Sequence, residues 1–227
     1  DEYNSILTSS GLPPTGTVPL SSSGESAPQP GGQVVTTSCG NIQLQDNYKL
    51  VKLSEHFTLA DYTQGGSRKL QPFQDKVTIE QLLCNAALHA KNILEPLRAA
   101  GFTFTITSGY RRGPDDLPPA ARAKYAAPGK VYNLSDHDYA AATDLFGVKL
   151  NGTPLSSYEA AQKMYEVIGG ACKQLLLEYT TSGSGSQGWV HIAYRQENGK
   201  PLRSAMHIGT LVDNDTKARE KLVNLKP

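Results

Sequence analysis

Three residues with side chains that bind zinc stand out in this sequence: His137, Asp144 and His191. A catalytic zinc typically takes three protein ligands from histidine and carboxylate side chains, together with one water. His137 and Asp144 are seven residues apart, which on a helix is a rise of about 10 Å and too far for one shared ion. The alternation of Ala140, Ala142 and Asp144 instead favours a strand, with His137 in the preceding loop and His191 on another strand.

The same spacing has a second interpretation that involves no metal. His191 lies between Trp189 and Ile192, where a histidine can also be a hydrogen-bonded core residue. A histidine and an aspartate at this spacing also occur together by chance in unrelated chains. The choice between the two interpretations therefore depends on the surrounding sequence.

Five segments around these residues resemble, in the same order, segments of peptidase family M15. They are residues 53–61 (LSEHFTLAD), 106–111 (ITSGYR), 135–144 (SDHDYAAATD), 174–178 (QLLLE) and 189–191 (WVH). The family contains zinc D-Ala-D-Ala carboxypeptidases and phage endolysins, and its fold resembles that of Hedgehog signalling proteins. The similarity extends over about residues 50 to 205 and is greatest to phage and prophage members. It implies Zn²⁺ bound by His137, Asp144 and His191.

Two positions depart from the pattern of the family. Ala140 replaces a glycine of the signature, a change between small residues that we expect to be harmless. Many members carry the general base three residues before the last zinc histidine, and this position is Gly188 here. Phage-type members instead have a glutamate on the strand before the final hairpin, and Glu178 fits that pattern. The resemblance thus implies Glu178 as the general base, with Asp136 and Asp138 as the next candidates.

The resemblance also implies roles for residues near the expected cluster. Arg111 would stabilise the substrate oxyanion or bind a substrate carboxylate, for which its planar guanidinium is suited. Ser135, Tyr110 and Trp189 would contact the bound peptide. Arg112 follows Arg111 directly. Neighbouring side chains of an extended segment point to opposite faces, so we expect only one of the two arginines to face the cleft.

The function that the resemblance implies is zinc-dependent hydrolysis of a peptidoglycan stem peptide at a bond that involves a D-amino acid. Zinc lowers the pKa of a bound water to about 7 and so provides hydroxide at neutral pH. We expect a phage virion component, at the tail tip or baseplate, that helps to penetrate the cell wall and acts in the periplasm or the wall. Two alternatives stay open: a catalytically weak or inactive binding or structural module of a tail, and a cellular carboxypeptidase that remodels the wall.

The composition argues against other classes of function. Twenty-two basic and 21 acidic residues give a net charge of +1, which provides no broad attraction to nucleic acid or to an anionic membrane. No apolar run reaches the roughly 20 residues that a membrane span requires. The first residue is Asp1 and no signal peptide is recognisable, so we expect a chain that is processed or cut from a longer one.

The three cysteines, Cys39, Cys84 and Cys172, have no metal-binding spacing. Buried reduced thiols are the simplest interpretation, although one disulfide could form in an oxidising compartment. The odd number argues against a disulfide framework, and the sequence leaves the pairing open.

Residues 1–48 differ in composition from the rest of the chain. Up to residue 45 the only charged residues are Asp1, Glu2 and Glu25, and Ser, Thr, Gly and Pro dominate. Such a segment is too poor in apolar side chains to fold on itself. We therefore expect residues 1–48 to form an extended arm that docks on tail or baseplate proteins, by strand addition or polyproline recognition, and residues 49–227 to form the peptidase domain.

The hydrophobic pattern of the second part predicts both helices and strands. Thr78 and Gln81 form a capping box for a helix that ends at Gly101, and Pro96 predicts a kink or an early end within it. A second capping box predicts a helix over about residues 156–169. Strands are expected over residues 102–107, 173–180 and 189–194, with a long loop over 113–134 and a hairpin loop over 182–188. The expected fold is α+β: a small, mainly antiparallel sheet with helices packed on one side.

Overall fold

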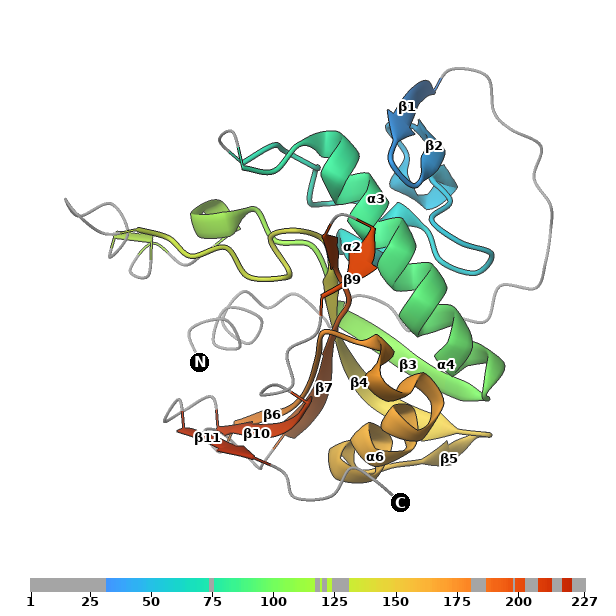
Figure 1. Ribbon diagram of the computed structural model, residues 1–227, viewed down its shortest axis with the longest axis vertical. Helices are drawn as coiled ribbons and strands as arrows, with labels where there is room; N and C mark the ends of the chain where they lie inside the picture. Colours follow the sequence, from blue (N-terminus) through green and yellow to red (C-terminus); the bar gives the residue numbers. More distant parts are fainter. Residues whose placement is uncertain are drawn as a thin grey trace.

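A seven-stranded sheet lies at the centre of the computed structural model, which describes residues 32–73, 76–116, 119, 122–123, 131–180, 187–197, 199–202, 208–213 and 218–221 (Figure 1). Its strands are β3 (Phe102–Ser108), β4 (Ala142–Leu150), β5 (Thr153–Pro154), β6 (Gln174–Thr180), β7 (Gln187–Ala193), β10 (Ile208–Asp213) and β11 (Ala218–Lys221). The order is β11-β10-β6-β7-β4-β3, and β5 pairs with β4. Only β6 and β10 pair in parallel. The predicted α+β class with a mainly antiparallel sheet is confirmed.

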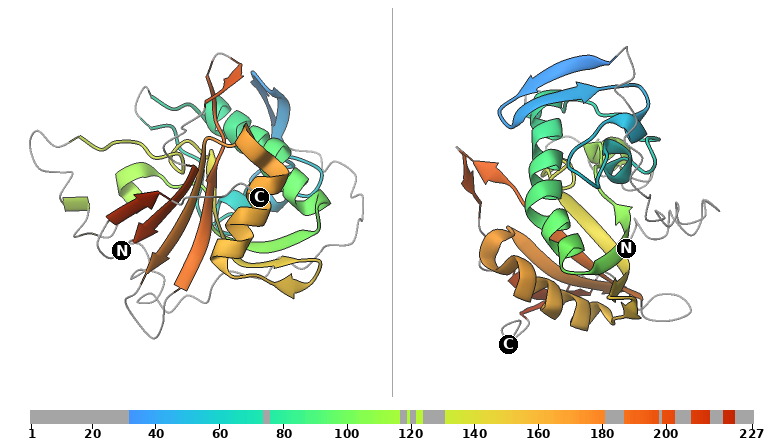
Figure 2. Two further views of the ribbon diagram at one scale, coloured as in Figure 1. Left: turned by 60° about the horizontal axis from the view of Figure 1, so that its bottom comes forward. Right: turned by 90° about the vertical axis from the view of Figure 1, so that its right-hand side faces the viewer.

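Two helical segments pack on this sheet from the same side (Figures 1 and 2). The first comprises α3 (Ile79–His89), the π-helical turn η2 (Ala90–Leu94) and α4 (Glu95–Ala99), and the second is α6 (Ser157–Ile168). Alternate residues of β6 and β7 belong to the buried core, namely Leu175, Leu177, Val190 and Ile192. The residues between them, including Glu178 and His191, point to the other face because side chains alternate along a strand. The sheet therefore carries its helices on one face and Glu178 and His191 on the other, which we call the open face because α3, α4 and α6 all lie on the opposite side.

The first helical segment begins and bends as its sequence predicts. Thr78 accepts a hydrogen bond from Gln81 N (3.2 Å), and the Gln81 side chain accepts one from Thr78 N (2.8 Å), which completes the capping box. The α-helix widens into the π-helical turn before Pro96, which lies in the first turn of α4 where its missing N–H breaks no helical bond. The segment ends at Gly101, whose φ of +91° suits glycine.

The second helix and the neighbouring strands also lie close to their predicted positions. Ser156 and Glu159 cap α6 reciprocally, and Gly169 terminates it with a φ of +52°. The predicted strands over 102–107, 173–180 and 189–194 correspond to β3, β6 and β7. Most of the predicted hairpin loop over 182–188 lies outside the described residues. The long loop begins with a 3₁₀ turn, η3 (Gly113–Asp116), and much of its remainder is also outside them.

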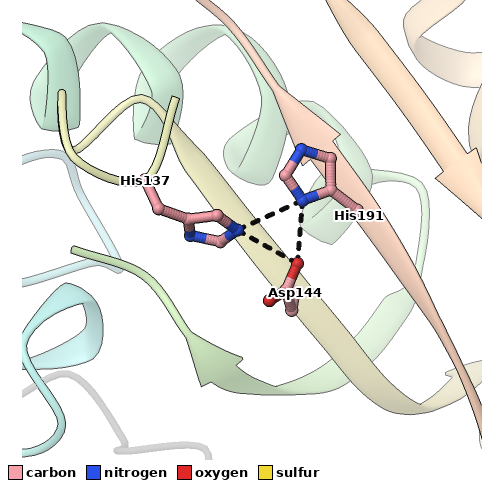
Figure 3. A group of neighbouring side chains, drawn as sticks. All are labelled: His137, Asp144 and His191. Carbon is pink, nitrogen blue, oxygen red and sulfur yellow. Dashed lines mark hydrogen bonds and ion pairs between the residues drawn. The ribbon is translucent and has the colours of Figure 1, made fainter. Parts of the chain in front are cut away.

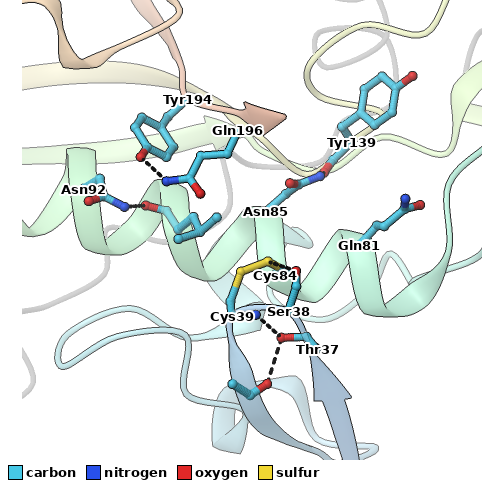
Figure 4. The surroundings of a disulfide bond; sticks show 12 residues. Thr37, Ser38, Cys39, Gln81, Cys84, Asn85, Asn92, Tyr139, Tyr194 and Gln196 are labelled. Carbon is cyan, nitrogen blue, oxygen red and sulfur yellow. Dashed lines mark hydrogen bonds between the residues drawn. A yellow bond between two sulfur atoms is a disulfide. The ribbon is translucent and has the colours of Figure 1, made fainter. Parts of the chain in front are cut away.

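A hairpin near the start of the described chain changes the predicted domain boundary. β1 (Gln33–Thr37) pairs with β2 (Gly40–Leu44), and the facing side chains Val35 and Ile42 are buried. A disulfide joins Cys39 in the turn to Cys84 on α3 (Figure 4). Residues 33–44 thus belong to the folded body instead of the expected arm. The hairpin buries only two apolar side chains among polar turn residues, so its composition resembles that of the preceding segment and did not reveal it. Residues 1–31, which would form the rest of the arm, lie outside the described residues.

The remaining elements are short. They are η1 (Tyr48–Leu50), α2 (Leu59–Tyr62), η4 (Gly169–Ala171), β8 (Gln196–Glu197) and β9 (Lys200–Pro201). Among the described residues, none of the helices has the length and apolar character needed to cross a membrane.

Candidate metal centre

Two strands and one turn bring the three predicted ligands together. Asp144 on β4 lies directly opposite His191 on β7 in the antiparallel register, so both side chains occupy the open face of the sheet. His137 lies in the turn that precedes β4, and a hydrogen bond from Ala140 N to His137 O (3.0 Å) closes this turn. The ligands therefore come from a loop and two strands, as the seven-residue spacing predicts.

The ligand atoms converge on one another (Figure 3). Asp144 Oδ1 lies 2.8 Å from His191 Nδ1 and 3.2 Å from His137 Nε2, and the two histidine nitrogens are 3.2 Å apart. All three residues are at most 6% exposed. Neutral and negative ligand atoms thus meet at one buried point on the open face.

The outer hydrogen bonds of the two histidines fix which nitrogen faces this point. His137 Nδ1 lies 2.6 Å from the carbonyl oxygen of Gly109, which can only accept, so Nδ1 carries the proton and Nε2 has the lone pair. His191 Nε2 lies 3.1 Å from Gln174 Oε1, and its Nδ1 lies 2.8 Å from Asp144 Oδ1, so both ring nitrogens have an acceptor beside them. With Nδ1 unprotonated, the lone pairs of His137, His191 and Asp144 would point at one another, and a cation between them would balance their negative potential.

The distances suit a metal ion in that position. Bonds of about 2.0–2.2 Å in a tetrahedral zinc site separate the ligand atoms by about 3.3–3.6 Å. The two separations that involve His137 Nε2, 3.2 Å each, lie close to this range, whereas the 2.8 Å between Asp144 Oδ1 and His191 Nδ1 is shorter and would lengthen when a metal binds. Two imidazole nitrogens and one carboxylate oxygen, each held from behind by a hydrogen bond, could therefore hold a metal ion with little rearrangement.

The charges in the cluster are strongly coupled. Burial alone would raise the pKa of Asp144, but the charges and hydrogen bonds of both histidines outweigh it and keep this pKa well below its usual value. Burial and the positive charge of Arg111 lower the pKa of His137. For His191, burial opposes the charged form, yet the hydrogen bond and charge of Asp144 outweigh it and raise the pKa. Without a metal, a proton shared between His191 and Asp144 would supply the positive charge.

Arg111 contacts the carboxylate of the candidate metal centre directly. Its Nη2 lies 3.1 Å from Asp144 Oδ2, the oxygen that does not face the histidines, and its Nε donates to Ser108 Oγ at 3.2 Å. Arg112 points elsewhere and pairs with Asp116 at 2.8 Å. Only one of the two arginines thus faces the site, as expected. In this position Arg111 orients and neutralises Asp144, a contact that the sequence did not predict.

Two of the predicted substrate contacts have other partners in the structure. Tyr110 is only 2% exposed, and its hydroxyl group bonds to the N–H and C=O of Gln71. We therefore correct its assignment to a core residue, because a buried and satisfied phenol offers nothing to a peptide. Both the backbone N–H and the hydroxyl of Ser135 donate to Asp138 Oδ2, at 2.7 and 2.8 Å. Ser135 thus stabilises the turn that carries His137.

Glu178 lies on the same face of the sheet as the cluster. It pairs with Trp189 across β6 and β7, one diagonal step from His191, and its Oε2 accepts a hydrogen bond from Trp189 Nε1 at 3.1 Å. Position 188, the alternative place for a base, faces the helices, because a Cβ on Gly188 would collide with Ser157 Oγ on α6. A side chain there would meet α6 and not the cluster, which favours Glu178.

The two alternative carboxylates have structural partners. Asp136 is buried and accepts two hydrogen bonds from Lys173 Nζ, at 2.7 and 2.8 Å. Asp138 is buried as well and accepts hydrogen bonds from Ser135, from Gly113 N and from the Tyr132 hydroxyl. Both carboxylates therefore hold the loop around His137 in place. Their engagement leaves Glu178 as the candidate base on the open face.

The alanine that replaces the signature glycine occupies a strained position. Ala140 has a φ of +54°, in the left-handed region that favours glycine, and is fully buried. An alanine in this conformation costs about 1 kcal/mol or more relative to glycine. The replacement of glycine by alanine at position 140, which we expected to be harmless, is compatible with the turn but costs conformational energy.

Sequence reasoning missed the residues that support the ligands from behind. Gln174 shares strand parity with Glu178, and this was an available signal for its place beside His191. Gly109 contributes its backbone carbonyl oxygen, which every residue type has, so the sequence could not indicate this contact. A further buried histidine, His89, accepts a hydrogen bond from the Tyr62 hydroxyl (2.7 Å) and donates to Ile192 O (3.1 Å). It ties α3 to the strand that carries His191.

Comparison of the chain with models of protein families, with curated proteins and with solved structures gave no match. The function must therefore be inferred from the site itself together with the sequence patterns.

Proposed function

We propose that this protein is a zinc-dependent peptidase that cleaves peptidoglycan stem peptides. The observation that carries the proposal is the buried cluster of His137, Asp144 and His191, with their ligand atoms convergent and a carboxylate, Glu178, one diagonal step away on the same face. Two imidazoles and one carboxylate are a common protein ligand set of hydrolytic zinc.

Each residue of the site has a task in such a reaction. Zinc, when bound, would polarise the scissile carbonyl and acidify a water. Glu178 would accept a proton from the attacking water and pass it to the leaving amine, since a carboxylate on the open face is placed for both transfers. Arg111 orients Asp144 by a hydrogen bond to Oδ2, which leaves Oδ1 facing the two histidines. The outer hydrogen bonds orient the two imidazole rings, so that Nε2 of His137 and Nδ1 of His191 are the atoms that would hold the metal.

The substrate class follows from the resemblance of residues 106–111, 135–144 and 189–191 to the M15 peptidases, which act on bonds that involve D-amino acids. We place the protein in a phage tail or baseplate, acting in the periplasm or wall, with residues 1–31 as a docking segment. The disulfide between Cys39 and Cys84 supports a site of action outside a reducing cytoplasm, because disulfides persist in oxidising compartments.

Digestion of purified sacculi tests the proposal. The zinc-loaded protein should release peptides with new amino and carboxyl termini, and mass spectrometry of the products identifies the bond. Asp144→Asn, which weakens the ligand set and keeps its shape, should abolish the release. Binding to sacculi without any new terminus would contradict the peptidase and indicate a binding or structural module. Release restricted to a terminal D-amino acid would indicate a carboxypeptidase.

A further inference from the structure

The hydrogen bond between Trp189 and Glu178 is a polar contact across the open face of the sheet. The indole Nε1 donates to Glu178 Oε2 at 3.1 Å, and the two residues are direct cross-strand partners on β7 and β6. Both side chains are partly buried. Trp189 is also the only tryptophan of the chain.

The contact joins a rigid side chain to a flexible one. A glutamate has three rotatable side-chain bonds, and fixing it in one orientation costs up to about 2 kcal/mol of conformational entropy. The indole has two rotatable bonds and a single N–H that can only donate. A hydrogen bond from this donor to a carboxylate is charge-assisted and therefore stronger than one between neutral groups. The rigid partner thus restricts where the carboxylate can lie.

The strand that carries Trp189 also carries a metal ligand. Trp189 and His191 are two residues apart on β7 and share the open face, so the indole has a fixed place relative to the cluster. A carboxylate that is hydrogen-bonded to the indole is therefore also held in position relative to the cluster. A general base must be within hydrogen-bond reach of its proton, and an error of about 1 Å can cost about 100-fold in rate.

We propose that Trp189 is a positioning residue, whose indole N–H holds the carboxylate of Glu178 in register with the metal cluster. This inference rests on the proposed function, in which Glu178 is the base. It differs from the role expected from the sequence, in which Trp189 contacts the substrate. An aromatic platform for substrate would need only the ring face, whereas positioning needs the N–H.

The first experiment tests the contact without any catalysis. Because the chain has one tryptophan, its indole N–H gives a single side-chain signal of this type in a ¹⁵N NMR spectrum of the full chain. In the wild-type protein this proton should exchange with solvent about 10-fold or more slowly than in Glu178→Ala, because the charge-assisted bond protects it. Glu166→Ala, which removes an exposed carboxylate on α6, is the matched control and should leave the exchange unchanged. Equal exchange in wild type and Glu178→Ala overturns the proposal.

The second experiment separates positioning from substrate contact. Trp189→Phe keeps an aromatic ring and removes the donor, so with soluble muropeptides kcat should fall about 10- to 100-fold while KM changes little. The same replacement in a Glu178→Gln background should cause no further loss, since the two residues act as a unit. Elemental analysis of Trp189→Phe should show the wild-type metal content, which excludes damage to the cluster.

Failure of the positioning role of Trp189 can be distinguished from failure of the proposed peptidase function. A raised KM with unchanged kcat in Trp189→Phe identifies a substrate contact and overturns positioning. Additive losses in the double variant overturn it too, because Trp189 would then act independently of Glu178. If the wild-type protein releases no peptide at all, the peptidase proposal fails, and no base remains for Trp189 to position. The exchange experiment would then show only whether the two side chains are bonded.

Discussion

Replacing Cys39 and Cys84 with serine removes the covalent bond between the N-terminal hairpin and α3. The two cysteines are 45 residues apart, and closing a loop of that length in the unfolded chain corresponds to about 4 kcal/mol of stability at 25 °C. Typical domains have only about 5–15 kcal/mol in total. We therefore expect the double variant to unfold far more easily, with the hairpin the first part to detach, since it buries only two apolar side chains.

Urea unfolding with and without a reducing agent measures this effect. At a typical urea dependence of about 2 kcal/mol/M, a loss of about 4 kcal/mol lowers the midpoint by about 2 M. A chelator belongs in every buffer, because a bound metal would stabilise the folded state by mass action and mask the change. The buried thiol of Cys172 is an internal standard: the denatured protein should show one thiol before reduction and three after it.

Two results would refute this reasoning. Three reactive thiols in the denatured, unreduced protein would mean that Cys39 and Cys84 are not joined. One thiol together with identical midpoints in oxidised and reduced protein would mean that the hairpin contributes nothing through its tether, so that residues 33–44 behave as the independent arm that the composition suggested.

Three further predictions concern the site and its surroundings. The purified protein should contain about one zinc per chain by elemental analysis, His137→Ala should lose it, and His56→Ala, whose ring pairs with Glu95 instead of the cluster, should keep it; full zinc in the first variant would contradict the ligand assignment. Glu178→Gln should bind zinc and fold but lose about 10²- to 10⁴-fold in turnover, whereas the exposed Glu166→Gln should match wild type. Burial lowers the pKa of His89 to about 3, compared with about 6.5 in an unfolded chain. The unfolded state therefore gains a proton first as the pH falls below about 6.5, which costs about 2 kcal/mol of stability by pH 5. An NMR titration should find this ring neutral down to about pH 4, and a midpoint near 6.5 would contradict it.

Local patterns predicted the elements that depend on local chemistry. The capping boxes that begin at Thr78 and Ser156 and the glycine stops at Gly101 and Gly169 could be read directly, because each depends on residues within a few positions. The shared face of Asp144 and His191 could be predicted for a similar reason, since strand parity places every second side chain on one face.

Other features depend on partners that are distant in sequence. The pairing of Cys39 with Cys84 follows from the hairpin packing on α3, which no spacing rule contains. The burial of Tyr110 follows from its contact with Gln71 across the fold, so the segment that resembles a functional motif carries one structural residue. The strained turn at Ala140 was also hidden, because a change from glycine to alanine shows its cost only when the φ angle is known.

Because side chains alternate along β7, the cluster of His137, Asp144 and His191 forms only when β4 and β7 pair in the correct register. A slip of one residue between β4 and β7 would exchange the core residue Val190 for the ligand His191 and would separate His191 from Asp144. The sequence between these two strands contains α6 and β6, so His191 can meet Asp144 only after that whole segment has been synthesised. A nascent or misregistered chain consequently lacks the complete cluster. If the cluster holds a metal, as proposed, binding by all three residues requires the nearly complete chain in its correct register.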